Sequence, residues 1–230
     1  WKSFFKATHL PSIKIRKYES STVQGIISES AENIIAVISR ASKIYANFLE
    51  GLSTQNSDLL KKSKKGVAKL DGEIEDLRDN IFFLIKNLDE TSVRGSNFYI
   101  IILAYLTDIA QSLEFISKKS YKHVNNQHQK LKFNQFKDLK EIEDRLDLLY
   151  KEIIDIFNSR KFERIAFVIA QKKELLGLIS VKIDTQIERT RSEESSPKNT
   201  TLYFNILLET KDLVNSIINL MEEYYSSYKK

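Results

Sequence analysis

Glycine and proline are scarce in this sequence, and that scarcity limits the folds open to it. The 230 residues include six glycines and two prolines, Pro11 and Pro197. At average usage a chain of this length would carry about 16 glycines and about 11 prolines. All-β folds need a turn residue every ~8–12 positions. The sequence therefore argues against an all-β fold and favours long helices.

Apolar residues recur at intervals of three and four along most of the chain, which is the spacing of an amphipathic helix. Two start signals are clear: Ser21-Thr22-Val23-Gln24 has capping-box spacing, and Ser196-Pro197 sets a serine cap before a proline. The pattern predicts six long helices over residues 22–52, 58–91, 93–125, 135–158, 160–191 and 196–228. Long helices joined by short polar loops bury their apolar faces against antiparallel neighbours, so we expect an elongated all-α bundle.

A shift of 104 residues superimposes the third predicted helix on the sixth. Over the 30 residues that begin at Ser92 and Ser196, seven positions are identical without a gap. Each matched helix is the third of its half. The repeat therefore predicts two similar three-helix units, about 19–125 and 135–230, and a serine cap at Ser92. The other identical pairs are Tyr99/Tyr203, Ile102/Ile206, Leu103/Leu207, Asp108/Asp212, Ser112/Ser216 and Tyr121/Tyr225.

The excess of positive charge lies at the beginning of the chain. The formal net charge is +5, and residues 1–18 hold five lysines and arginines and no acid. Aromatic residues are interspersed among these cations, a combination that suits the headgroup layer of a membrane. We predict that 1–18 is a juxtamembrane linker at the cytoplasmic face of the cell membrane, with a frayed terminus as the alternative. The predicted membrane contacts in it are Lys14, Arg16 and Lys17.

No membrane span is expected within the chain itself. The longest apolar stretch without a formal charge covers 13 residues, 95–107, whereas a span needs about 20. The sequence begins with Trp1 rather than methionine, so we interpret it as a processed chain or a piece of a longer one.

A second basic stretch lies between Glu114 and Asp138, where the chain carries six lysines and no acid. Such a run is usually a solvated face, and the alternative is an anion site. The candidate anion or membrane contacts are Lys118, Lys119 and Lys122. Aromatic residues do not recur at regular spacing here, so binding to nucleic acid is not predicted.

The sequence offers no catalytic constellation. Cysteine is absent, and the three histidines fit no metal or catalytic motif. His123 and His128 are five residues apart, so on a helix they would point in different directions. We predict that the chain is not an enzyme and has no cofactor. Asp108 and Asp212 are repeat-equivalent acids inside apolar helices. Each is either a hydrogen-bonded residue at the edge of the apolar helix face or a position for a cation or a regulatory contact.

These features together resemble a known family, the PhoU-like cytoplasmic C-terminal domains of bacterial PiT-type inorganic phosphate transporters. The resemblance implies two tandem three-helix bundles and a regulatory or accessory role in phosphate uptake. Its implied partners are the membrane domain of the same chain and a second copy of the domain. The segments that carry it are 89–92, 96–99, 105–108, 117–126 and 196–204.

One property of that family does not carry over. PhoU-like proteins commonly bind metal through acids four residues apart on the third helix of each unit. Here Glu114 is followed at that spacing by Lys118, and Asp108 and Asp212 are each followed by serine. We therefore predict that the metal site is absent or weakened. The alternatives are a freestanding metal-binding PhoU-type regulator and a helical dimerisation scaffold.

Overall fold

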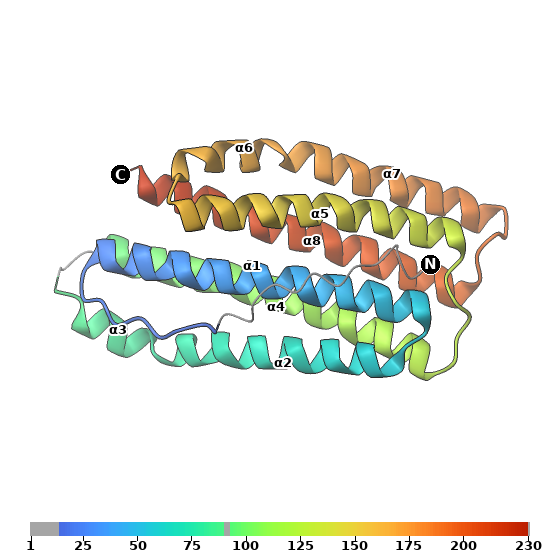
Figure 1. The fold of residues 1–230 in the computed structure, drawn as a ribbon, viewed down its shortest axis with the longest axis horizontal. Helices are drawn as coiled ribbons and strands as arrows, with labels where there is room; N and C mark the ends of the chain where they lie inside the picture. Colours follow the sequence, from blue (N-terminus) through green and yellow to red (C-terminus); the bar gives the residue numbers. More distant parts are fainter. Residues whose placement is uncertain (1–13, 90–92, 230) are drawn as a thin grey trace.

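The protein is all-helical, as the sequence predicts. The computed structural model describes residues 14–89 and 93–229, and those ranges contain helices and loops but no strand. The helices, coloured along the chain in Figure 1, are α1 Val23–Thr54, α2 Ser57–Asp79, α3 Ile81–Asn87, α4 Val93–Asn125, α5 Phe133–Ser159, the 3₁₀ turn η1 Phe162–Arg164, α6 Ile165–Ala170, α7 Lys172–Arg191 and α8 Pro197–Tyr228.

Four of the six predicted helices are confirmed with ends within two residues of those predicted: α1, α4, α5 and α8. The start of α8 is as expected, because the Ser196 hydroxyl accepts a hydrogen bond from the amide of Asn199 at 3.2 Å. At α1 the predicted cap was wrong by one residue. Thr22, not Ser21, accepts from the Gly25 amide, at 3.1 Å.

Two predicted helices are interrupted. The helix expected over 58–91 breaks at Asn80 and ends at Asn87. The Asn80 side chain donates to the Asp76 carbonyl at 2.6 Å, a local bond that competes with regular helix. The helix expected over 160–191 divides into η1, α6 and α7, with Gln171 at the break donating to Glu152 of α5 at 2.7 Å. Neither interruption involves glycine or proline, which is why the sequence pattern did not reveal it.

The helices lie in two groups along the long axis of the molecule (Figure 1). One group holds α1, α2 and α4, and the other holds α5, η1, α6, α7 and α8. The most extensive contact of all joins the groups, where α4 packs antiparallel to α8; α1 against α5 is a second join. The buried apolar side chains of both groups belong to one contiguous core, because each helix buries a face along its whole length.

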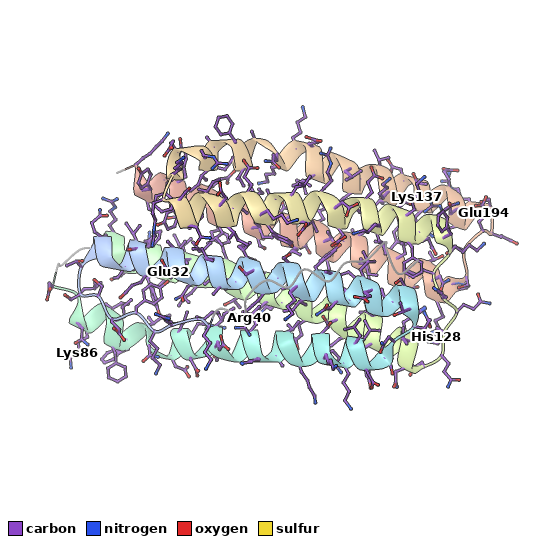
Figure 2. The ribbon with its side chains drawn as sticks, in the orientation of Figure 1. Glu32, Arg40, Lys86, His128, Lys137 and Glu194 are labelled. Atoms are coloured by element: carbon purple, nitrogen blue, oxygen red, sulfur yellow. The ribbon has the colours of Figure 1, made fainter. Side chains whose placement is uncertain are left out.

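Polar side chains tie the helices together inside each group and between them. Arg40 of α1 pairs with Glu73 of α2 at 2.5 Å (Figure 2). The repeat-equivalent Tyr99 and Tyr203 are both buried, and each hydroxyl donates within its own group. Tyr99 reaches the Leu77 carbonyl at 2.8 Å, and Tyr203 reaches a buried carboxylate of α5 at 3.0 Å.

The described part of the predicted linker packs on the helices. Arg16 and the Asn33 side chain exchange two hydrogen bonds of 2.9 Å, and the Tyr18 hydroxyl bonds to Ser30 at 2.8 Å. The side chains of Lys14, Arg16 and Lys17 are exposed. The remainder of the linker and the predicted Ser92 cap lie outside the described residues.

By length and composition α4 is the one described helix that could span a membrane. Half of its most apolar window, 50%, is buried inside the fold. Its apolar face contacts α1, α2 and α8, so the bundle itself accounts for much of the hydropathy of this helix.

Candidate functional site

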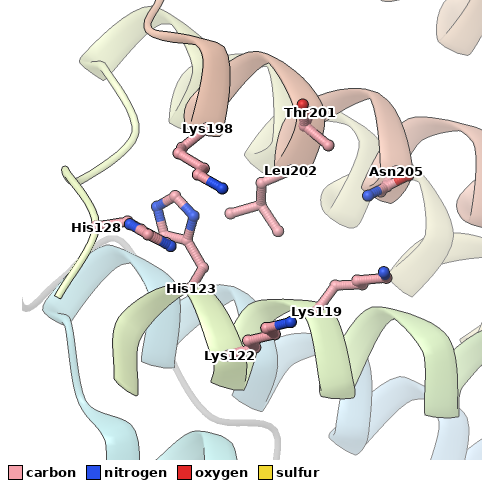
Figure 3. A pocket seen from close by; sticks show the side chains of 8 residues that line it. All are labelled: Lys119, Lys122, His123, His128, Lys198, Thr201, Leu202 and Asn205. Carbon is pink, nitrogen blue, oxygen red and sulfur yellow. The ribbon is translucent and has the colours of Figure 1, made fainter. Parts of the chain in front are cut away.

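A cavity of about 190 Å³ lies between the C-terminal turns of α4 and the first turns of α8. We call it the cationic pocket, and Figure 3 shows it from close by. Positive and polar side chains dominate its lining, which consists of Lys119, Lys122, His123, His128, Lys198, Thr201, Leu202 and Asn205.

Helical spacing and the antiparallel packing bring these residues together. The α4 contributors stand at 119, 122 and 123, and the α8 contributors at 198, 201, 202 and 205. Intervals of three and four place side chains on one helix face. The last turns of α4 therefore face the first turns of α8 with lysine on both sides.

A tight turn at the end of α4 brings His128 back to the pocket. Gln127 adopts a left-handed conformation, with φ of 56°. Its amide donates to Val124, and the His128 amide donates to the His123 carbonyl at 3.1 Å, the bonding pattern of a Schellman cap. The centroids of the two imidazole rings are 5.2 Å apart. The expectation that these histidines point in different directions was wrong, because His128 lies beyond the helix.

Two further hydrogen bonds hold the loop after this turn. The ring Nε2 of His123 lies 2.8 Å from the Gln129 carbonyl, and the buried Asn199 side chain of α8 donates to the Lys130 carbonyl at 3.0 Å. The loop is thereby attached to both helices that form the pocket.

The pocket has an uncompensated positive charge. None of the described side chains that line it is a carboxylate. Burial lowers the pKa of His123 below its ordinary 6.5, an effect partly offset by the Gln129 carbonyl and reinforced by His128 and Lys198. His123 is therefore largely neutral at pH 7, and the charge there comes from three lysines.

Of the three predicted contacts in this stretch, Lys119 and Lys122 line the pocket and Lys118 does not. Lys118 instead pairs with Glu114 at 2.5 Å, one turn earlier on α4. Lys198, Thr201 and Asn205 were missed by sequence reasoning. The signal that would have found them is the antiparallel contact of the two matched helices, which sets the end of one beside the start of the other.

Asp108 and Asp212 meet at a second hollow, of about 460 Å³, midway along the α4–α8 contact. We call it the acidic groove. Both aspartates are exposed, and three repeat-equivalent pairs line the groove together. Although Asp108 is exposed as a whole residue, partial burial of its carboxyl raises its pKa; partial burial also raises the pKa of Glu209, and there the Asp212 charge adds to it. The lining residues are Asp108, Gln111, Ser112, Phe115, Glu209, Asp212, Asn215 and Ser216.

Across residues 14–89 and 93–229, no group of three or more histidine, aspartate or glutamate side chains is placed to hold a metal ion. The weakened metal site and the lack of enzyme activity stay predictions.

The chain matches no protein-family model, and no curated protein is similar to it in sequence. The resemblance to PhoU-like domains stays an expectation from the sequence.

Proposed function

We propose that this chain is a regulatory or accessory domain on the cytoplasmic side of an inorganic phosphate transporter of the PiT type. The observation that supports the proposal best is the antiparallel contact of α4 with α8. These are the third helices of the two sequence repeats, and repeat-equivalent side chains face one groove between them. The contact supports the expectation of two similar helical units that each end in a matched helix, which is the arrangement of a PhoU-like domain.

The proposed mechanism is contact. A helix face docks on the membrane domain of the transporter or on a second copy, and the docked state changes the rate of transport. The short helix α3 offers a surface for such docking. Phe82 and Phe83 on it are 67% and 61% exposed, and Lys86 follows at the end of the same helix (Figure 2). Exposed aromatic side chains of this kind are enriched in protein interfaces.

Phosphate uptake by cells that carry the complete gene tests the proposal. The altered gene lacks the segment that encodes 19–230, and uptake of labelled phosphate is measured at scarce and at abundant phosphate. We expect the dependence of uptake on external phosphate to change. Equal uptake in the altered and unaltered cells under both conditions would contradict a regulatory role.

Point variants then test the docking surface. Phe82→Ser with Phe83→Ser should reproduce part of the effect of the deletion, because the change removes exposed apolar surface without opening the core. The matched control is Phe167→Ser on α6, which is 65% exposed and should leave uptake unchanged. An effect of the control as large as that of the α3 variant would place the docking surface elsewhere.

A freestanding metal-binding regulator is the second candidate, which the resemblance to PhoU-type proteins implies; the three carboxylates that line the acidic groove are not placed to hold one ion. Metal analysis of the purified protein separates the two. Iron, zinc or manganese at one or more ions per chain would support the second candidate.

A further inference from the structure

We infer that the cationic pocket is a binding site for a small dissolved oxyanion with two negative charges, of which inorganic phosphate is the type. The choice of phosphate among such anions rests on the proposed function, whereas the charge and size of the ligand rest on the pocket alone.

The charge of the ligand follows from the lysines. Three lysines from two helices line one cavity, and none of the described lining residues is an acid; the Lys119 amine also lies 5.1 Å from the centre of the Phe115 ring. Lys122 and Lys198 form no ion pair within residues 14–89 and 93–229. Bringing like charges together is unfavourable unless an opposite charge joins them. An anion with two charges would remove most of this repulsion.

The repeat supplies an internal comparison. A shift of 104 residues relates the lysines of the pocket to Arg94, Glu223 and Ser226 at the opposite end of the α4–α8 contact. Of these three residues only Arg94 is a cation; it donates to the Ser227 carbonyl at 3.0 Å, and an acid takes the place of Lys119. The repeat therefore does not by itself require lysine at these positions.

The size of the cavity favours a small ion. At about 190 Å³ it is smaller than the acidic groove, of about 460 Å³, on the same helix contact, and it has room for a tetrahedral oxyanion with some water. The lining also lacks a phenylalanine, tyrosine or tryptophan among its described residues, so a nucleotide base would find no ring of that kind to stack on.

The remaining polar groups suit the oxygens of such an ion. Thr201 and Asn205 lie on the same face of α8 as Lys198, and their side chains carry hydroxyl and amide donors. Figure 3 shows the Lys198 amine and the imidazole of His123 close to one another at the end of the pocket where His128 also lies. Charge-assisted hydrogen bonds from lysine and neutral ones from threonine and asparagine would together replace the hydration of the anion.

The test is a titration of the complete purified chain with inorganic phosphate, at constant ionic strength set by chloride. Calorimetry measures the affinity, and NMR follows the imidazole signals. We expect a dissociation constant on the order of 1 mM or tighter, and shifts of the His123 and His128 signals. Absence of heat and of signal shifts up to about 10 mM phosphate overturns the inference.

Variants locate the site. Lys122→Gln and Lys198→Gln should each weaken binding by about tenfold, because each removes a charge-assisted contact. Lys118→Gln is the matched control, since it removes the same charge from the same helix but from a side chain that pairs with Glu114 outside the pocket. We expect the control to weaken binding by less than about twofold. An equal loss in all three variants would mean a diffuse charge effect and would overturn the inference.

A second arm separates dissolved phosphate from the phosphate of a lipid headgroup. Vesicles of phosphatidylcholine with phosphatidic acid replace the dissolved anion in a co-sedimentation assay. Binding to vesicles with no response to dissolved phosphate would contradict the assignment. If the purified chain binds phosphate but deletion of the domain leaves uptake unchanged, the binding site stands and the proposed function is wrong. If the purified chain does not bind phosphate but the deletion alters uptake, the proposed function stands and the binding site is wrong.

Discussion

Asp108 of α4 and Asp212 of α8 are 104 residues apart in the sequence and line the same groove, at the middle of the most extensive helix contact in the molecule. Because α4 and α8 are antiparallel, equivalent positions of the repeat meet only near such a midpoint. The two aspartates therefore lie beside one groove because their equivalent positions fall near that midpoint.

Removing one charge from the acidic groove should stabilise the fold. Burial and the Asp212 charge raise the pKa of Glu209. A carboxyl whose pKa is higher in the folded state than in the unfolded state stabilises the fold below its unfolded pKa, and loses that contribution as the pH rises through the folded pKa. Glu209→Gln should therefore raise the melting temperature at pH 7, and the gain should vanish near pH 4.

Thermal unfolding followed by circular dichroism at the two pH values checks this. Glu222→Gln, on an exposed part of the same helix, is the control and should leave the melting temperature nearly unchanged. If Glu209→Gln melts at a lower temperature than the unaltered protein at pH 7, the expectation is contradicted.

The pocket should bind anions more tightly in mild acid. Burial keeps the pKa of His123 below 6.5 in the free protein, and a bound anion would raise that pKa, so binding takes up a proton. Sulfate is the probe because its own charge does not change over this range. We expect its affinity to increase as the pH falls from about 7.5 to about 5.5.

Calorimetric titrations with sulfate at the two pH values measure the effect. A variant with both His123→Gln and His128→Gln should still bind sulfate through the lysines, but with little dependence on pH. An undiminished dependence in that variant would show that another group is responsible.

Asp138 should be a major contributor to the stability of the second helix group. Its buried carboxylate on α5 lies 3.2 Å from Lys182 and 2.8 Å from Arg189, and accepts from Tyr203 at 3.0 Å. Asp138→Asn would leave Arg189 without its charge partner and Lys182 with Glu141 alone, at a cost of about 3 kcal/mol in the free energy of unfolding. Urea denaturation measures it. Glu188→Gln, which breaks an exposed pair, should cost less than about 0.5 kcal/mol.

Replacing either of two glycines by alanine should change the stability of the fold, but in opposite directions. Around Gly72 on α2, nothing within 4 Å would meet an added Cβ, so Gly72→Ala should stabilise by about 0.5–1 kcal/mol through helix propensity. At Gly51 the same Cβ would lie 2.7 Å from Leu60 of α2, and Gly51→Ala should destabilise by about 1–3 kcal/mol. Denaturant midpoints compare the two, and a destabilised Gly72→Ala would contradict the reasoning.

The sequence was sufficient for the helices and insufficient for their interruptions and ends. Stripes of apolar residues at helical spacing predict α4 within its observed bounds, because burial of that face dominates the stability of the helix. The breaks at Asn80 and Gln171 depend on single side-chain bonds to neighbours, and such bonds leave no periodic signal.

The scarcity of glycine itself concealed one feature of the candidate site. Helix ends in the left-handed conformation are usually marked by glycine, but here the positive-φ residues are Gln55, Gln127, Arg160 and Glu193. The turn at Gln127 was therefore not visible in the sequence, and neither was the approach of His128 to His123. Half of the cationic pocket could be predicted from the lysine run, and the other half needed the antiparallel contact with α8.

The position of α8 has a consequence for how the chain matures. α4 has the length and hydropathy of a possible membrane span, and α8, its main neighbour, is made only after α5, α6 and α7. Until α8 has been synthesised, one flank of α4 has no covering helix. A chain truncated before α8 would leave this apolar face of α4 exposed to water, and chaperones and proteases act on proteins with such exposed apolar surface.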